Sequence, residues 1–156
     1  MDLRKRGIKS NGYYQIFDGT GQNPCEPTMV YCDMTSEPCM IWTLVESWTK
    51  GNRTLRAFQR DVYSVDSPVN YDAPNWYAYR MTRYQMNRLK ERSTHWRATC
   101  SFPKLDVDYR DYVRGNFRDF DIMTFIGNDQ CKKVDYVNIR GHKSSNTKVV
   151  FWQTLG

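Results

Sequence analysis

Residues 95–102 carry the sequence feature that most constrains what this chain can fold into, because apolar and polar side chains alternate there. The apolar positions of this stretch are Trp96, Ala98, Cys100 and Phe102, and the polar ones are Arg97, Thr99 and Ser101. Successive side chains of a β-strand point to opposite faces, so the pattern predicts a strand with one buried and one solvent-facing side. The fold must therefore supply a sheet with a core on one side of it.

Short runs rich in β-branched and aromatic residues recur along the chain, and turn residues end most of them. They predict further strands over residues 12–17, 29–32, 40–48, 77–81, 107–113, 120–126, 134–139 and 149–152. Residues 49–74 are polar and interrupted by prolines, which indicates a long irregular connection with one short segment near residues 55–63. We expect turns at residues 127–129 and a loop over residues 140–146.

One helix is predicted, over residues 82–92. Thr82 followed by Gln85 fits the capping box, in which each side chain satisfies the other's free backbone N–H. Met86 and Leu89 then share one face of the helix. Since no repeat or low-complexity tract divides the 156 residues, we expect a single α+β domain that is dominated by strands and largely antiparallel.

Composition excludes some classes of protein. Aromatic residues make up 15% of the chain, which is more than a disordered chain carries. Mean hydropathy is −0.76, and no apolar run approaches the roughly 20 residues of a spanning helix, so we expect no membrane insertion. The net charge of +6 permits attraction to polyanions, although we expect no nucleic-acid partner. The candidate polyanion patch, whose alternative is a solvated helix face, is Arg80, Arg83, Arg88 and Arg92.

Residue patterns that would support catalysis or metal binding are weak. His95 and His142 have no metal-ligand spacing, and we expect structural or surface roles for both. Asp106 and Asp108 are weak candidates for Ca²⁺ ligands, because they would face the same way on a strand but form no cage of six to eight oxygens. Arg110 is close enough in sequence to pair with them instead. We therefore expect no cofactor and no enzymatic activity.

The cysteines and one sequon bear on the compartment. Cys25, Cys32 and Cys39 recur at intervals of seven residues amid prolines, which is typical of a disulfide-stapled segment. Asn52 begins the only Asn-x-Ser/Thr sequon, which predicts glycosylation there. The chain opens without an apolar leader. We expect a secreted, extracellular domain whose leader is missing, and five cysteines with one left free allow fifteen pairings.

Several segments, taken in order, resemble the fibrinogen-related domains. Residues 2–7 and then Ser10-Asn11-Gly12-Tyr13-Tyr14-Gln15-Ile16 resemble the family's opening helix and its "G-x-Y-x-I" strand. Val30-Tyr31-Cys32-Asp33-Met34 resembles the "V-Y-C-D-M" strand, and Trp42-Thr43-Leu44 stands where the family has "G-W-T-V". Tyr79-Arg80-Met81, the helix through Leu89 and Trp96-Arg97-Ala98-Thr99 resemble its strand–helix–strand unit.

The resemblance implies a fibrinogen C-terminal-like fold of a divergent, coral-like invertebrate type. Residues 1–48 would form the N-terminal subdomain and residues 49–156 the central sheet subdomain. Cys39-Met40-Ile41 replaces the glycines that usually precede the family's Trp, so the turn there must differ. No segment after Asn138 resembles the region of the family that holds its calcium site and ligand pocket. No family binding residue is therefore carried over, and we expect a chain truncated at both ends.

The resemblance also implies a function and a set of disulfides. The function would be a lectin-like or cell-adhesion module that binds glycans or extracellular-matrix proteins without enzymatic activity. In the family, the Cys of the "V-Y-C-D-M" strand pairs with one that would here precede Met1, so Cys32 is expected to be unpaired and able to link an oligomer. Cys25 would then pair with Cys39, and Cys100 with Cys131, with Cys25–Cys32 as the main alternative.

Two other functions stay open at this point. The first is a structural extracellular-matrix or biomineral-associated protein that acts through assembly and has no defined ligand site. The second is a basic protein that binds polyanions or nucleic acid, which rests on the net charge alone.

Overall fold

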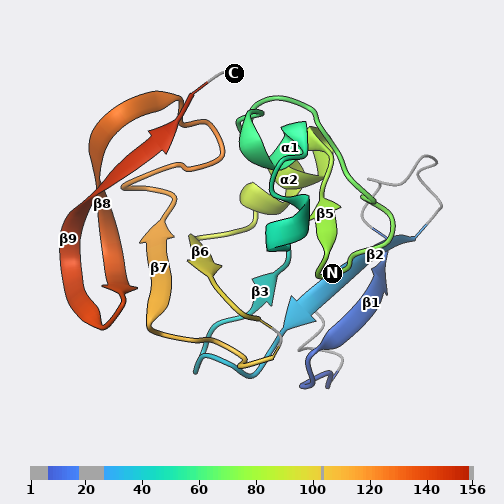
Figure 1. Cartoon of the computed structure of the whole chain (residues 1–156). Coiled ribbons are helices and arrows are strands. Elements are labelled where there is room, and N and C mark those ends of the chain that lie inside the picture. Colours follow the sequence, from blue (N-terminus) through green and yellow to red (C-terminus); the bar gives the residue numbers. More distant parts are fainter. Residues whose placement is uncertain (1–6, 18–26, 103, 155–156) are drawn as a thin grey trace.

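The computed structural model of the chain describes residues 7–17, 27–102 and 104–154, and in these residues it has three antiparallel sheets (Figure 1). The first sheet contains β1 (Gly12–Ile16), β2 (Thr28–Asp33) and β3 (Trp42–Thr43). The second contains β4 (Glu46–Trp48) and β5 (Ala78–Arg80). The third contains β6 (His95–Thr99), β7 (Asp111–Asn116), β8 (Gly127–Ile139) and β9 (His142–Gln153), in that order.

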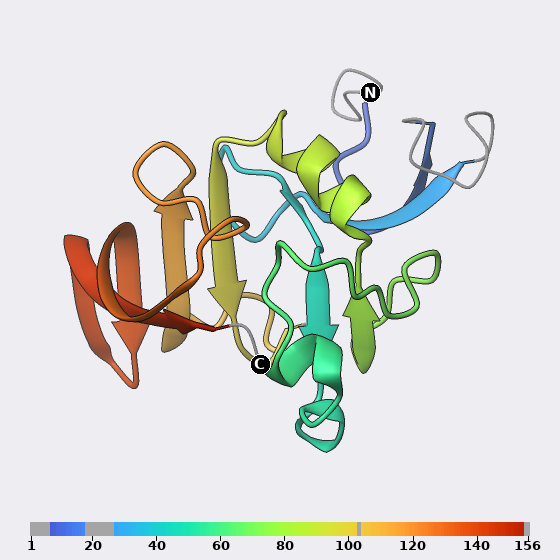
Figure 2. The same cartoon turned by 90° about the horizontal axis from the view of Figure 1, so that it is seen from above.

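In the described ranges the helical segments are short: η2 (Lys50–Asn52), α1 (Arg56–Gln59) and α2 (Arg83–Lys90). Seen from above, β6–β9 form a row on one side of the molecule, and β4, β5 and α1 lie on the other side (Figure 2). Among the described residues, no helix is long and apolar enough to cross a membrane. The three antiparallel sheets and the few short helices confirm the predicted strand-dominated, antiparallel class.

The local sequence signals agree with the structure where they were strongest. The helix predicted from Thr82 and Gln85 is α2, and both hydrogen bonds of its capping box are present. The alternating stretch that begins at His95 forms β6, and the runs at residues 12–17 and 29–32 are β1 and β2. The predicted faces of β6 are wrong, because Ala98 and Cys100 are exposed while the side chain of Arg97 is only 9% exposed and lies against two carboxylates. Residues 40–48 form two short strands rather than one. The short helix expected at the start of the chain, over residues 2–9, lies largely outside the described residues, and residues 7–9 are not helical.

Two predictions for the C-terminal part are wrong. Residues 120–126 are not a strand, because the carboxylate of Asp121 accepts from Met123 N at 3.1 Å and from Thr124 Oγ1 at 2.7 Å and so holds the chain in turns. Residues 127–129 and 142–146 are not turns or loops but parts of β8 and β9. The hairpin turns only at Arg140 and Gly141, whose φ angles of 50° and 88° match the two-residue turns that suit strand twist.

The buried side chains form two clusters. The first lies between β2, β5 and α2 and contains Val30, Cys32, Met34, Tyr79, Met81, Met86 and Met123. The second lies against the β6–β9 sheet and contains Trp96, Phe120, Phe125, Val134 and Val137. Phe117 and Ile122 pack against both clusters, so the segment between β7 and β8 joins them. Trp96 donates from its indole nitrogen to Phe120 O at 2.9 Å, and it leaves no room for a Cβ at Gly115.

The long connection before β5 is organised by the buried side chain of Arg80, which is 1% exposed. Its guanidinium donates to the backbone carbonyls of Ala57, Asp61 (2.8 Å), Val62 (2.8 Å) and Val65 (3.3 Å). A backbone carbonyl that is buried without a hydrogen-bond donor costs free energy. Arg80 supplies this donor to four carbonyls of a segment that has little regular secondary structure of its own. Arg80 therefore does not belong to a surface patch, and this part of the polyanion prediction is wrong.

The carboxylate of Glu46 is the acidic partner of Arg80. Its Oε2 lies 3.3 Å from Arg80 Nη1, and its Oε1 accepts from the Tyr63 hydroxyl at 3.4 Å. Burial outweighs the attraction to Arg80 and raises the pKa of Glu46 from 4.5 to about 7. The folded chain therefore binds a proton that the unfolded chain releases between these two pH values. The stability due to this proton is fully present below pH 4.5 and is lost as the pH rises through about 7.

Glu46→Gln should remove this pH dependence, because glutamine does not titrate; its amide oxygen can still accept from Arg80 and its NH₂ group can donate to the Tyr63 hydroxyl oxygen. Relative to the variant, the wild-type protein should lose about 3 kcal/mol of unfolding free energy between pH 4.5 and pH 8. Urea unfolding across this range measures the difference. The exposed Glu91→Gln is the matched control and should follow the wild type. An E46Q protein whose stability follows the wild type at every pH would contradict the prediction.

Candidate binding site

A buried cluster of charges holds the segment after β2 against the third sheet. Arg97 lies on β6, and its Nη2 is 2.5 Å from Asp33 Oδ2 while its Nη1 is 2.5 Å from Glu37 Oε2. Glu37 also accepts from the Tyr112 hydroxyl at 2.7 Å and from Arg114 Nη1 at 3.1 Å. Asp33 and Glu37 are 2% and 4% exposed, so these contacts are made away from water. We call these five residues the Arg97 cluster.

The Arg97 cluster sets the charge state of its members. Burial opposes ionisation of Asp33, but hydrogen bonds from Ser36 and Arg97 hold the pKa of this carboxyl below its usual range. Burial and the neighbouring Glu37 raise the pKa of Tyr112. The guanidinium carbon of Arg97 also lies 4.7 Å from the ring centroid of Trp42, which fixes that indole from one side.

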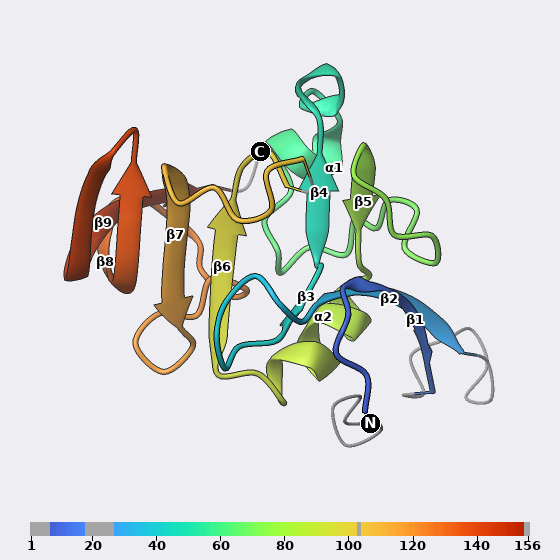
Figure 3. The same cartoon turned by 90° about the horizontal axis from the view of Figure 1, so that it is seen from below.

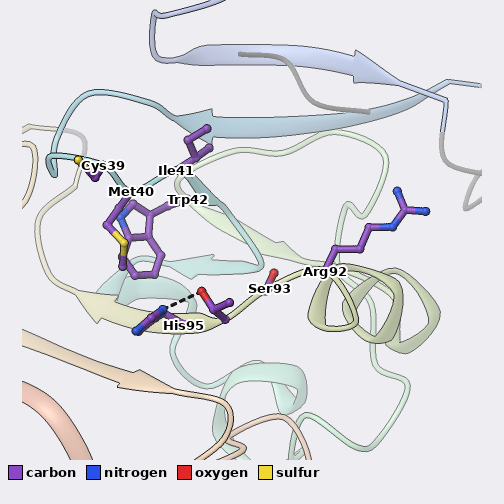
Figure 4. A pocket seen from close by; sticks show the side chains of 8 residues that line it. Cys39, Met40, Ile41, Trp42, Arg92, Ser93 and His95 are labelled. Atoms are coloured by element: carbon purple, nitrogen blue, oxygen red, sulfur yellow. Dashed lines mark hydrogen bonds between the residues drawn. The ribbon is translucent and has the colours of Figure 1, made fainter. Parts of the chain in front are cut away.

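The segments 39–42 and 92–95 line one pocket that opens to solvent and has a volume of about 190 Å³ (Figure 4). One wall is Cys39, Met40, Ile41 and Trp42, and the other is Arg92, Ser93, Thr94 and His95. Cys39 has a φ of 63°, the left-handed region that favours glycine, so the turn before Trp42 forms here without one. The guanidinium of Arg92 points away from Trp42, which leaves hydroxyls and an imidazole as the polar groups beside the indole (Figure 4).

The hydroxyl of Thr94 is hydrogen-bonded to an imidazole that lies beside a carboxylate. Thr94 Oγ1 lies 2.8 Å from His95 Nδ1, and His95 Nε2 lies 3.4 Å from Asp135 Oδ2 on β8. Asn116 on β7 donates to Asp135 Oδ1 at 2.8 Å. In the tautomer whose Nδ1 carries no proton, Nδ1 is an acceptor and Thr94 donates to it. The lone pairs of the Thr94 oxygen are then free to accept from a ligand.

Sequence reasoning did not find this site. It placed His95 at the start of a strand but had no local signal for Asp135, which is brought in by the register of β6, β7 and β8. Trp42 was expected only as part of a strand. The remaining site predictions fall elsewhere in the structure.

The predicted arginine patch is not one surface. Arg80 is buried, and Arg83 and Arg88 are five residues apart on α2, which separates them by about 140° around the helix axis. Arg88 forms an ion pair with Glu91 at 2.8 Å. Arg92 follows the helix at the pocket. The four arginines are therefore at separate places: Arg80 is in the interior, Arg83 and Arg88 are on two sides of α2, and Arg92 is at the rim of the pocket.

The candidate calcium ligands do not form a site. Asp106 and Asp108 precede β7 in an irregular segment, so the expectation that they share a strand face is wrong. Asp108 instead accepts from Arg110 Nε at 3.1 Å, and this hydrogen bond lowers its pKa. The described part of the chain contains no cluster of three or more His, Cys, Asp or Glu side chains that could hold a metal ion.

The predicted bridge between Cys100 and Cys131 is wrong, because both residues are exposed free thiols. Cys100 N donates to Asp111 O, and Asp111 pairs with Ile139 at the far end of β8 from Cys131. Eight residues of strand, or about 26 Å, separate Ile139 from Cys131, whereas bridged Cα atoms lie within about 7 Å.

The other two cysteine predictions have different outcomes. Cys39 is exposed, and its expected partner Cys25 lies outside the described residues, so that pairing stays a prediction. Cys32 is 4% exposed within the first core cluster, and burial raises the pKa of its thiol. It is therefore not placed to link an oligomer from the surface, as the sequence had led us to expect.

The sequon residue Asn52 lies in η2. Its Nδ2 donates to Tyr77 O at 2.9 Å and lies 3.3 Å from Thr49 Oγ1. A glycan on this nitrogen would leave it one N–H for both contacts. Glycosylation at Asn52 stays a prediction.

Removal of the Arg97 side chain tests how far the site depends on its charge cluster. Arg97→Met leaves Asp33 and Glu37 buried without their main cation and should lower the unfolding free energy by about 3–5 kcal/mol. Arg110→Met breaks an exposed ion pair and is the control, with little change expected. Urea unfolding of both variants measures the effect. Equal stabilities of the two variants would contradict the role given to Arg97.

Comparisons of the chain with protein-family models, with curated proteins and with solved structures find no match.

Proposed function

We propose that this protein is a non-enzymatic recognition module that binds a single sugar residue of a glycan in the pocket between Trp42 and Thr94. The observation that carries the proposal is the pairing of an immobilised indole with fixed hydroxyl and imidazole groups in one small, open pocket. The alternative partner is a matrix protein that presents a group of the same chemistry.

A sugar ring has a face of C–H groups and a rim of hydroxyls, and the pocket offers a counterpart to each. The indole of Trp42 can lie against the C–H face, as aromatic rings do against apolar surface. The Thr94 hydroxyl oxygen can accept hydrogen bonds from the rim, and so can Ser93 Oγ, whose own proton is donated to Leu89 O at 2.7 Å. A volume of about 190 Å³ is below the 300–1,000 Å³ of pockets for drug-sized ligands, so the pocket suits one terminal residue and not a long chain.

The rigidity of the site supports binding at modest cost in entropy. Arg97 fixes Trp42 from behind, and Asp135 fixes the His95 imidazole that orients Thr94. Groups that are already ordered lose little conformational freedom when a ligand arrives. The Thr94 oxygen, as an acceptor, would select a ligand that presents an O–H or N–H group there.

The membership in the fibrinogen-related domains and the extracellular location are also part of the proposal. The family proposal is supported by the order of elements. The two N-terminal segments that resemble the family are strands, β1 and β2, and the third such segment has the order strand–helix–strand, β5–α2–β6. The location rests on the Cys25–Cys39 segment and the sequon at Asn52, since the Cys100–Cys131 bridge no longer supports it.

Thr94→Val removes the fixed acceptor at nearly constant volume. On a glycan array, the wild-type protein should bind a subset of glycans, and T94V should bind them about tenfold more weakly, the size of one hydrogen bond. Thr154→Val, a change of the same kind at an exposed threonine outside the pocket, is the control and should bind as the wild type does.

Three results would overturn this function. The first is a folded wild-type protein that binds no glycan on the array, and the second is a T94V protein that binds as tightly as the wild type. The third is hydrolysis of an activated ester such as p-nitrophenyl acetate that is lost in T94V. It would mean that His95 activates the Thr94 hydroxyl as a nucleophile, and the protein would then be an enzyme.

A further inference from the structure

The strand β9 has an open edge. It is the last strand of the third sheet and is 12 residues long, whereas strands commonly have five or six (Figure 3). Within the described residues, no backbone hydrogen bond joins β9 to any segment other than β8. Alternate residues of β9 therefore present unpaired N–H and C=O groups to solvent, and such an edge is a template for another extended chain.

The edge is positively charged. β9 contains Lys143 and Lys148, both exposed, and no acidic residue. The register places Lys148 directly opposite Lys133, whose ammonium already pairs with Asp119 at 2.8 Å. Like charges directly opposite each other on a sheet are destabilising, and among the residues that the structure describes no carboxylate forms an ion pair with Lys148.

We propose that the outer edge of β9 binds an extended, acidic segment of another protein by strand addition. Backbone hydrogen bonds would supply the common part of the affinity, and side chains on the added strand would supply selectivity. A second copy of this chain is the less favourable occupant. Pairing β9 with itself would bring together two strands that carry only positive charge.

The exposed side chains of β9 define which segment fits. Lys148, Val150 and Trp152 follow at every second position, and the last two are 52% and 72% exposed. They therefore share one face of the strand. An added strand with an acidic residue beside Lys148 and apolar residues beside Val150 and Trp152 would contact each of these side chains with a group of matching chemistry. This site is separate from the pocket, so the two proposals stand or fall independently.

The test is amide hydrogen exchange of the full chain with a synthetic seven-residue peptide, capped at both ends. The peptide has Glu, Val and Val at every second position and Thr between them. It should slow exchange of β9 amides at least tenfold at low salt, and the protection should weaken as salt is added. The same peptide with Lys in place of Glu, or with a central Pro, should give little protection.

A pair of variants completes the test. Lys148→Glu should weaken binding of the Glu peptide at least tenfold, and Lys50→Glu, the same charge change in η2, should leave it unchanged. Equal protection by the Lys peptide, or by a single-stranded DNA oligomer, would overturn the proposal. So would protection of β9 that grows with protein concentration when no peptide is present, because the occupant would then be a second copy.

Discussion

Arg97 is the residue on which the arrangement of this protein depends most. Its guanidinium meets Asp33 and Glu37, which are more than fifty residues away in sequence and nearly without exposure to water. Carboxylates in such surroundings are tolerated only when a cation and hydrogen-bond donors compensate them. The same guanidinium lies over Trp42. One side chain therefore fixes the segment after β2 against β6 and also holds the wall of the pocket in place.

A second buried arginine changes how the net charge is understood. Arg80 serves the carbonyls of the irregular connection before β5, and Arg97 serves two carboxylates, so neither contributes to a surface field. Among the described strands, Lys143 and Lys148 of β9 are exposed cations without an ion pair, whereas Lys132 of β8 lies over the rings of Phe120 and Phe125. A charge count taken from sequence is correct as a sum, but which cations reach solvent is decided by burial.

Local signals in the sequence predicted local structure, and contacts distant in sequence escaped them. The capping box of Thr82 and Gln85 and the alternation that begins at His95 both depend on neighbours within four residues. The hairpin of β8 and β9 was missed because Arg140-Gly141 is a weak turn signal and residues 142–146 are exposed on both faces, which hides the alternation. The contact of His95 with Asp135 and the distance between Cys100 and Cys131 both follow from strand register, which no local pattern encodes.

Register also explains why so long a hairpin matters to a pocket at the other edge of the sheet. Asp135 reaches His95 only because β8 pairs with β7 in one alignment, and a slip of one residue would turn its carboxylate to the opposite face. The same slip would expose Val134, which is 1% exposed in the second core cluster. The buried Val134 therefore fixes the register, and the register places the carboxylate that orients His95 and, through it, the hydroxyl of Thr94.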